Sequence, residues 1–173
     1  CRAGVDTYPD PPGTKTENAK YYVSHLGGSS ANIAVAITKL GGHCHLLTCL
    51  PNNALGRYII NQLNDYGVKT SLIKNLSDRD IRTSLAIIET TNEDHQSIIF
   101  RNCAADLFLS KDHIKNVNFA KFSCVIITGT SFASEPSRSA TFEAIKLASK
   151  INLPIIMDVD FRPYTWSSVK EAA

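Results

Sequence analysis

The sequence predicts an α/β fold with a mainly parallel sheet and flanking helices. Residues 124–128 and 154–158 are short apolar runs, which are typical of strands buried on both faces. Between them, residues 137–150 carry apolar side chains at helical spacing. Because a helical crossover joins parallel strands, this order of strand, helix and strand predicts a parallel sheet covered by helices.

Length and composition limit the class of protein. The chain has 173 residues, enough for one domain with its own core, and it is 43% hydrophobic and 20% charged, as in ordinary globular proteins. A formal net charge of +2 argues against nucleic acid or an anionic membrane as the main partner. The longest apolar runs are too short to span a bilayer. Five cysteines without a CxxC pair predict reduced thiols and a cytoplasmic protein.

The first part of the chain predicts a loop followed by a helix. Residues 7–16 are rich in Pro, Gly, Thr and Asp, which indicates an irregular loop. After the pair Gly27-Gly28, Ser30 is a candidate N-cap for a helix that starts at Ala31. Apolar residues then recur at helical spacing and predict one buried face: Ile33, Ala36, Ile37 and Leu40.

The middle of the chain predicts short strands. Residues 45–50 are typical of a strand, and residues 54–66 of a helix that Gly67 ends. Residues 71–74, 83–89 and 96–100 are typical of strands separated by polar turns. No helical pattern separates these three strands, so we expect them to pair antiparallel in a small sheet outside the main body.

The pair Gly27-Gly28 is the first candidate site. Glycine lets the backbone bend tightly and approach a ligand closely, because it has no Cβ. Asn32 falls in the first turn of the predicted helix, where its amide can donate to and accept from a polyol hydroxyl. The backbone N–H groups of that turn suit a polar or anionic small molecule.

A second candidate site lies at the end of the last predicted strand. Asp158, Asp160 and Arg162 follow the apolar run, and Asp6 follows the first strand in the same way. Ligands of parallel sheets bind beyond the carboxyl ends of the strands. Arg162 can hold a carboxylate or phosphate through two N–H groups. Two alternatives stay open: an Asp–Arg pair that only fixes a loop, and a cation site, for which nothing nearby in the sequence gives support.

The remaining candidate residues and motifs give only weak evidence of a functional site. Arg101 and Asn102 follow the strand at 96–100, and Arg101 taken alone is more typical of a solvated residue than of a site, since arginine is mostly exposed. His43 and His45 alternate on one side of a strand but lack a third ligand for zinc. The sequence has no GxSxG, GxGxxG or GxxxxGK[ST] motif. We therefore predict no catalytic, cofactor-binding or metal-binding residue within this chain.

Taken together, these motifs resemble the ribokinase-like (PfkB-type) sugar kinases. The resemblance covers the chain and depends on the order of three segments: 27–34 with its Gly-Gly pair, an antiparallel segment, and the Asp-x-Asp-x-Arg-Pro sequence from Asp158. Within the family it is strongest to the kinases of 5-dehydro-2-deoxy-D-gluconate, a keto-sugar acid of inositol catabolism. That likeness is carried by residues 2–6, 101–107 and 160–166.

The resemblance implies a ribokinase-like domain with a β lid formed by residues near 12–25 and 70–101. It implies ATP-dependent phosphorylation of a sugar or sugar acid, with Mg²⁺, and it allows a homodimer through the lid. The substrate-binding residues implied by position are Asp6, Gly27, Gly28, Asn32, Arg101, Asn102, Asp160 and Arg162. Arg101 and Arg162 are similar to the pair that relatives use for a substrate carboxylate, and two guanidinium groups suit an anion better than a neutral sugar.

The chain also departs from the family pattern. Ser30 stands where Gly, Ala or Pro is frequent, and Asn53 replaces the carboxylate of a Gly-x-Asp-x-x-Gly turn. The Gly-Ala-Gly-Asp motif, which carries the family's catalytic base, and the Asn-x-x-Glu magnesium motif are absent from the sequence. We therefore expect these 173 residues to be the N-terminal, substrate-binding part of a kinase, without activity alone. Two alternatives remain: a kinase for a neutral sugar or nucleoside, and a non-catalytic sugar-binding module.

Overall fold

The computed structural model describes residues 2–162, 166, 168 and 170. Its largest sheet has the strand order β2-β1-β5-β6. Strand β1 (Gly4–Asp10) pairs antiparallel with β2 (Tyr21–Gly27) and parallel with β5 (Ser84–Ile88), which pairs antiparallel with β6 (Ser97–Phe100). The expectation of a loop over residues 7–16 is therefore wrong for its first four residues, which continue β1.

Two parallel pairs complete the strands of the described chain. Strand β3 (Thr48–Pro51) pairs with β4 (Ile73–Leu76), and β7 (Val125–Thr128) pairs with β8 (Ile155–Asp158). The parallel pairing of β7 and β8 confirms the strand, helix and strand predicted near the C-terminus. The antiparallel pairing expected for residues 71–74 is wrong, because helix α2 separates β3 from β4 and makes them a parallel crossover unit.

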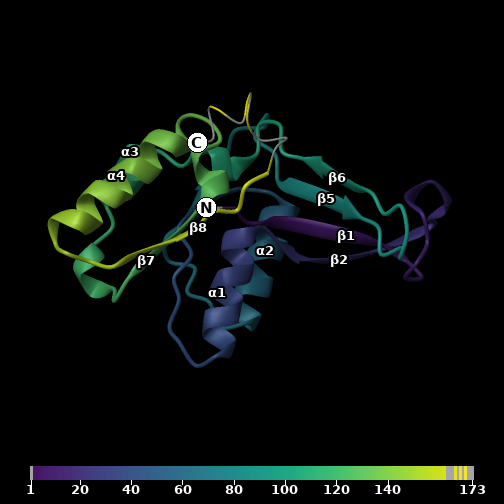
Figure 1. The fold of residues 1–173 in the computed structure, drawn as a ribbon, viewed down its shortest axis with the longest axis horizontal. Helices are drawn as coiled ribbons and strands as arrows, with labels where there is room; N and C mark the ends of the chain where they lie inside the picture. Colours follow the sequence, from purple (N-terminus) through teal and green to yellow (C-terminus); the bar gives the residue numbers. More distant parts are fainter. Residues whose placement is uncertain (1, 163–165, 167, 169, 171–173) are drawn as a thin grey trace.

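Within residues 2–162, four α-helices flank these strands. They are α1 (Ser29–Lys39), α2 (Ala54–Asp65), the short α3 (Lys111–Lys115) and α4 (Ser137–Lys150). Gly67 has φ +82°, as the predicted helix end after α2 requires. In Figure 1, α1 and α2 lie below the β1–β2 end of the large sheet, whereas α3 and α4 lie beside β7 and β8. Four 3₁₀ turns connect the elements: Thr16–Asn18, Ala105–Phe108, Phe119–Lys121 and Gly129–Phe132.

Two apolar clusters lie on opposite faces of β3. Leu50 belongs to a cluster with residues of β1, α1 and α2, while its neighbour Cys49 belongs to a cluster with α3 and α4. This division follows from strand geometry, because successive side chains point to opposite faces. Helix α4 packs through small residues four positions apart, Ala140, Ala144 and Ala148, which let its backbone approach closely.

Helix α1 turns a different face to the core than the sequence pattern predicted. Ala31 and Ala34 are buried, whereas Leu40 is 88% exposed and Ala36 is exposed. Ile33 and Ile37 instead line an apolar hollow of about 420 Å³ between α1 and β7. Large apolar side chains thus mark the hollow, while small ones mark the packed face.

Strand β8 differs from its prediction as a buried strand. All four of its residues are exposed, because β7 is its only hydrogen-bonded neighbour within the described chain. Residues 163–165, which belong to the segment that carries the family resemblance, lie outside the described residues. No helix of the described chain is long and apolar enough to cross a membrane.

The carboxylate of Glu89 links two turns at the outer end of the large sheet through hydrogen bonds. Glu89 accepts the backbone N–H of Thr16 at 2.7 Å and that of Gln96 at 3.0 Å. These bonds lower the pKa of Glu89, because they stabilise its charged form. Glu89 therefore joins the turn between β1 and β2 to the turn between β5 and β6.

Candidate functional site

The glycine pair forms a tight entry to α1. Gly28 is the N-cap residue, with φ 97° and ψ 133°, and a Cβ there would lie 2.6 Å from the carbonyl oxygen of Arg2. Only glycine suits both the positive φ and this close approach. Helix α1 therefore begins at Ser29, and the prediction of Ser30 as N-cap of a helix starting at Ala31 is wrong.

Asp6 lies against the other glycine. A Cβ on Gly27 would overlap the Asp6 carboxylate, so the absence of a side chain there leaves room for it. Burial raises the pKa of Asp6, and the nearby charges of Arg2 and His25 partly oppose that rise. The carboxylate is half-buried at the inner end of β1, beside the entry to α1.

Asn32 occupies the first turn of α1, as predicted. Its backbone N–H donates to the carbonyl oxygen of Gly28 at 2.9 Å, and the residue is exposed. Its side-chain amide makes no hydrogen bond to the described residues. Asp6, Gly27 and Gly28 thus lie where β1, β2 and α1 come together, and Asn32 lies one turn into α1 from them.

Arg101 is tied to a buried carboxylate that the sequence pattern did not single out as its partner. Its Nε and Nη2 donate to Oδ2 of Asp106 at 3.1 and 2.5 Å, and Nη2 also donates to the carbonyl oxygen of Thr130 at 3.3 Å. The Arg101 side chain is 11% exposed and that of Asp106 is 1% exposed. The interpretation of Arg101 as a solvated residue is therefore wrong.

Arg162 is also paired with a carboxylate. Its Nη2 lies 3.1 Å from Oδ1 of Asp160, whose side chain is 4% exposed, whereas the Arg162 side chain is 52% exposed. Asp160 has φ 37°, and its backbone N–H donates to Asp158 at 3.1 Å. The ion pair that the sequence left as one alternative is present, and half of the guanidinium side chain still reaches solvent.

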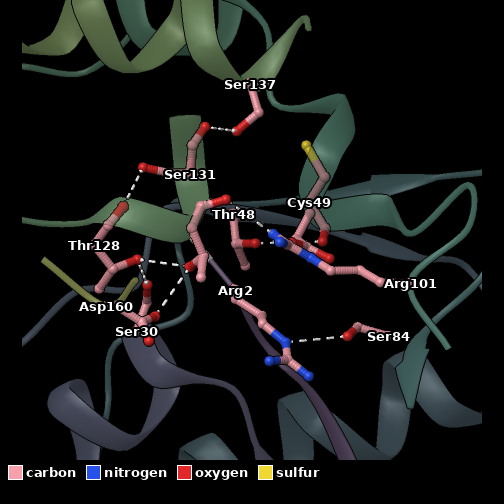
Figure 2. Close-up of polar contacts among 12 residues, drawn as sticks. Arg2, Ser30, Thr48, Cys49, Ser84, Arg101, Thr128, Ser131, Ser137 and Asp160 are labelled. Atoms are coloured by element: carbon pink, nitrogen blue, oxygen red, sulfur yellow. Dashed lines mark hydrogen bonds and ion pairs between the residues drawn. The ribbon is translucent and has the colours of Figure 1, made fainter. Parts of the chain in front are cut away.

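A chain of hydroxyl groups joins α1 to Asp160. Ser30 Oγ lies 3.1 Å from Thr128 Oγ1 (Figure 2). Thr128 Oγ1 lies 3.3 Å from Thr130 Oγ1, which in turn lies 3.2 Å from Asp160 Oδ2. An ionised carboxylate only accepts, so Thr130 must donate to it. Each hydroxyl carries one proton, so Thr128 then donates to Thr130, and Ser30 donates to Thr128.

Some site residues carried no sequence signal. Thr128 and Thr130 are buried hydroxyls that look like ordinary strand-end residues in the sequence. Arg2 was noted only as part of a motif, yet its Nε donates to Ser84 Oγ at 3.2 Å and its charge acts on Asp6 (Figure 2). Asn102, in contrast, is exposed and makes no side-chain hydrogen bond to the described residues.

The described residues offer no cation centre. They contain no group of three or more His, Cys, Asp or Glu side chains that could hold a metal ion. The apolar hollow beside α1 is lined by none of the predicted substrate-binding residues. The polar side chains of the candidate site lie instead at the carboxyl ends of β7 and β8 and at the glycine turn. Their hydrogen-bonding groups suit a ligand that carries hydroxyl and carboxylate groups.

Comparison with protein families matches residues 4–173 to the pfkB family of carbohydrate kinases. The chain belongs to the pfkB family. It is 35% identical over 173 residues to the 5-dehydro-2-deoxygluconokinase of Photobacterium profundum, covering 99% of this chain and 52% of that protein. It is 33% identical over 159 residues to the enzyme of the same name from Bacillus licheniformis, covering 91% and 48%. The chain thus spans about half the length of these curated relatives.

Solved structures of sugar kinases share the fold. The 2-dehydro-3-deoxygluconokinase of Thermotoga maritima superposes with a TM-score of 0.84 at 20% identity, over 95% of this chain and 51% of that one. A fructokinase of Xylella fastidiosa with bound ATP gives 0.84 at 24% identity, over 97% and 49%. The predicted ribokinase-like α/β fold of this pfkB chain is therefore confirmed.

Proposed function

We propose that this pfkB chain is the substrate-binding part of a kinase that phosphorylates a keto-sugar acid with ATP, and that the acid is 5-dehydro-2-deoxy-D-gluconate. The observation that carries the proposal is the pair of arginines, Arg101 and Arg162, each held by a carboxylate at least 96% buried. Two oriented guanidinium groups favour an anionic substrate over a neutral one. The names of the curated relatives agree with this choice.

We assign the substrate hydroxyls to the glycine turn. Asp6 can accept a hydrogen bond from a hydroxyl, and Asn32 can donate and accept. Gly27 and Gly28 leave the backbone open to the sugar. Asn102 and Asp160 complete the proposed set, Asp160 by orienting Arg162 and Asn102 as an exposed amide beside Arg101.

Phosphoryl transfer needs further groups. It depends on positioning, on a base for the attacking hydroxyl and on positive charge around the phosphates. The described residues supply positioning, and they contain no cluster of three or more His, Cys, Asp or Glu side chains that could hold a metal ion. We therefore propose that ATP and Mg²⁺ act in the whole protein, and that the 173-residue chain alone has no turnover with ATP and the acid.

Two further features of the whole protein belong to the proposal. Tyr21 on β2 and Phe100 on β6 are 71% and 50% exposed, so apolar side chains of the lid are available for a homodimer. Sedimentation of the protein with and without Tyr21→Ser tests this contact. We also place the protein in the cytoplasm, because the four described cysteines are all free thiols.

Ligand titration tests the proposed substrate. We expect Arg162→Ala to weaken binding of 5-dehydro-2-deoxy-D-gluconate by about 1.5–3 kcal/mol, the range for hydrogen bonds to charged groups. Arg57→Ala on the exposed side of α2 is the matched control and leaves the affinity unchanged. Equal affinity in the wild type and Arg162→Ala would contradict the proposal and favour a neutral sugar. If the protein bound no sugar or sugar acid at all, neither the sugar-acid kinase nor the neutral-sugar kinase would be supported.

A further inference from the structure

The two arginines are not independent, because one buried residue contacts both of their networks. The carbonyl oxygen of Thr130 accepts a hydrogen bond from Arg101 Nη2 at 3.3 Å. The hydroxyl of the same residue donates to Asp160 Oδ2 at 3.2 Å, and the other oxygen of Asp160 holds Arg162. Thr130 is 1% exposed, so water does not compete for these bonds.

We infer that Thr130 is a positioning residue that sets the separation between Arg101 and Arg162 and so makes the site selective for an anionic substrate. This inference rests on the proposed function, since it assumes that the two guanidinium groups hold a carboxylate. Thr130 does not contact the substrate in this account. It acts through the carbonyl oxygen that fixes one arginine and the hydroxyl that fixes the partner of the other.

The backbone around Thr130 is held firmly. A Cβ on Gly129 would overlap the carbonyl oxygen of Val159, so the segment after β7 is packed directly against the segment after β8. On the far side, Ser131 Oγ donates to the carbonyl oxygen of Thr128 at 2.7 Å, and Ser137 Oγ donates to that of Ser131 at 2.8 Å (Figure 2). Thr130 is therefore a fixed point from which both arginine networks extend.

Arg101 retains donors for a ligand in this arrangement. Its Nε and Nη2 are used by Asp106 and Thr130, while the two N–H groups on Nη1 have no protein acceptor within residues 2–162. A guanidinium presents its donors in a fixed plane, so holding Nε and Nη2 also fixes the direction of Nη1. The donors on Nη1 are not buried without a partner, so they are open to solvent or to a ligand.

The hydroxyl chain from Ser30 strengthens the hydrogen bond that Thr130 donates to Asp160. Thr130 receives a hydrogen bond from Thr128, which receives one from Ser30, and a chain of this kind polarises the last donor toward the carboxylate. Removing the Thr130 hydroxyl leaves Oδ2 of Asp160 without this donor in a site that is 4% exposed. Asp160 then turns toward its other partners, and Arg162 moves with it.

The test compares a charged ligand with a neutral one. The dissociation constants of 5-dehydro-2-deoxy-D-gluconate and of its primary amide, which keeps every hydroxyl and lacks the charge, are measured by calorimetry. We expect Thr130→Val to raise the dissociation constant of the acid about tenfold and to leave that of the amide within about twofold. Thr130→Ser, which keeps the hydroxyl, restores the affinity for the acid.

Thr141→Val is the matched control for loss of a buried threonine hydroxyl. Thr141 is 5% exposed and donates only to the carbonyl oxygen of Ser137 within α4. We expect this variant to lose stability and to keep both dissociation constants. The inference is overturned if Thr130→Val changes the dissociation constants of both ligands equally or changes neither of them. It is also overturned if Thr130→Ser does not restore the affinity for the acid, because Thr130 then has a structural role only.

Two controls separate this inference from the proposed function. If Arg162→Ala leaves the affinity for the acid unchanged, the proposed function fails. If Arg162→Ala weakens binding of the acid and Thr130→Val does not, only the inference fails. Should Thr130→Val not fold, a crystal structure of the wild type with the acid decides: the inference requires both Thr130 bonds to persist, and their loss on binding overturns it.

Discussion

Replacement of Gly28 by alanine tests the close approach that forms the entry to α1. The new Cβ would lie 2.6 Å from the Arg2 carbonyl oxygen and 3.0 Å from the Cα of Ala3, both of which are backbone atoms that cannot rotate away. Helix α1 must therefore move off β1. That movement breaks the hydrogen bond from Ala31 N to the Arg2 oxygen, which is 3.2 Å long.

The expected loss has two parts. A side chain at positive φ costs about 1–3 kcal/mol. The displacement adds a lost hydrogen bond, about 0.5–1.5 kcal/mol, and overpacking of about 1–3 kcal/mol. Gly41 is the matched control, because it has φ +89° and a Cβ there meets no atom within 4 Å. Gly28→Ala should therefore lower the free energy of unfolding by about 1.5–4.5 kcal/mol more than Gly41→Ala does.

Urea denaturation followed by circular dichroism measures both variants against the wild type. The same samples are titrated with 5-dehydro-2-deoxy-D-gluconate, and we expect Gly28→Ala to bind it more weakly because the first turn of α1 has shifted. Equal losses of stability in the two variants would refute the close-approach argument. Unchanged ligand binding in a destabilised Gly28→Ala would separate the glycine turn from the site.

Three further predictions use other features. Asp106→Ala leaves a buried guanidinium without its partner and should cost about 3–5 kcal/mol in urea denaturation, whereas Asp112→Ala, which breaks an exposed pair, should cost under about 1 kcal/mol; similar losses would contradict this. Burial raises the pKa of Cys49 to about 11, so iodoacetamide should label the exposed Cys103 well before Cys49 in native protein, and the reverse order by mass spectrometry would be evidence against it. The pKa of Glu89 is lowered on folding, so the contribution of this carboxylate to the free energy of unfolding is complete above its ordinary pKa of 4.5 and is lost as the pH falls through the lowered pKa. The difference in stability between wild type and Glu89→Gln should therefore shrink from about pH 6 to about pH 3. A difference that stays constant over this range would count against the two backbone hydrogen bonds.

Sequence periodicity predicted the helical elements better than the strands. The range of α4 agrees with its prediction, and that of α2 differs by one residue, because both carry regular apolar spacing and clear ends. Strand β1 was missed beyond Asp6, since prolines there resemble a loop. From Tyr8 onward β1 has a partner on one side only, and such a position tolerates proline.

The sequence singled out the residues that we propose to face the ligand, but not the residues that support them. The glycine pair, Asp6 and Arg162 have local signals in the sequence. The partner of Arg101 lies five residues away, and the link between Arg101 and Arg162 runs through Thr130, which is distant from both in the sequence. Hydrogen bonds of this kind depend on which strand ends meet, and that is a property of the tertiary fold.

Strand β1 belongs to two parts of the molecule at once. Val5, near its inner end, is buried among the residues that pack against α1 and α2, while Asp10 at its outer end pairs with Tyr21 far out on the sheet. No loop interrupts it, so the outer sheet has no free hinge along this strand. Any movement of the outer sheet would therefore have to bend β1 itself, and the bend would reach Asp6, which lies one residue from the buried Val5.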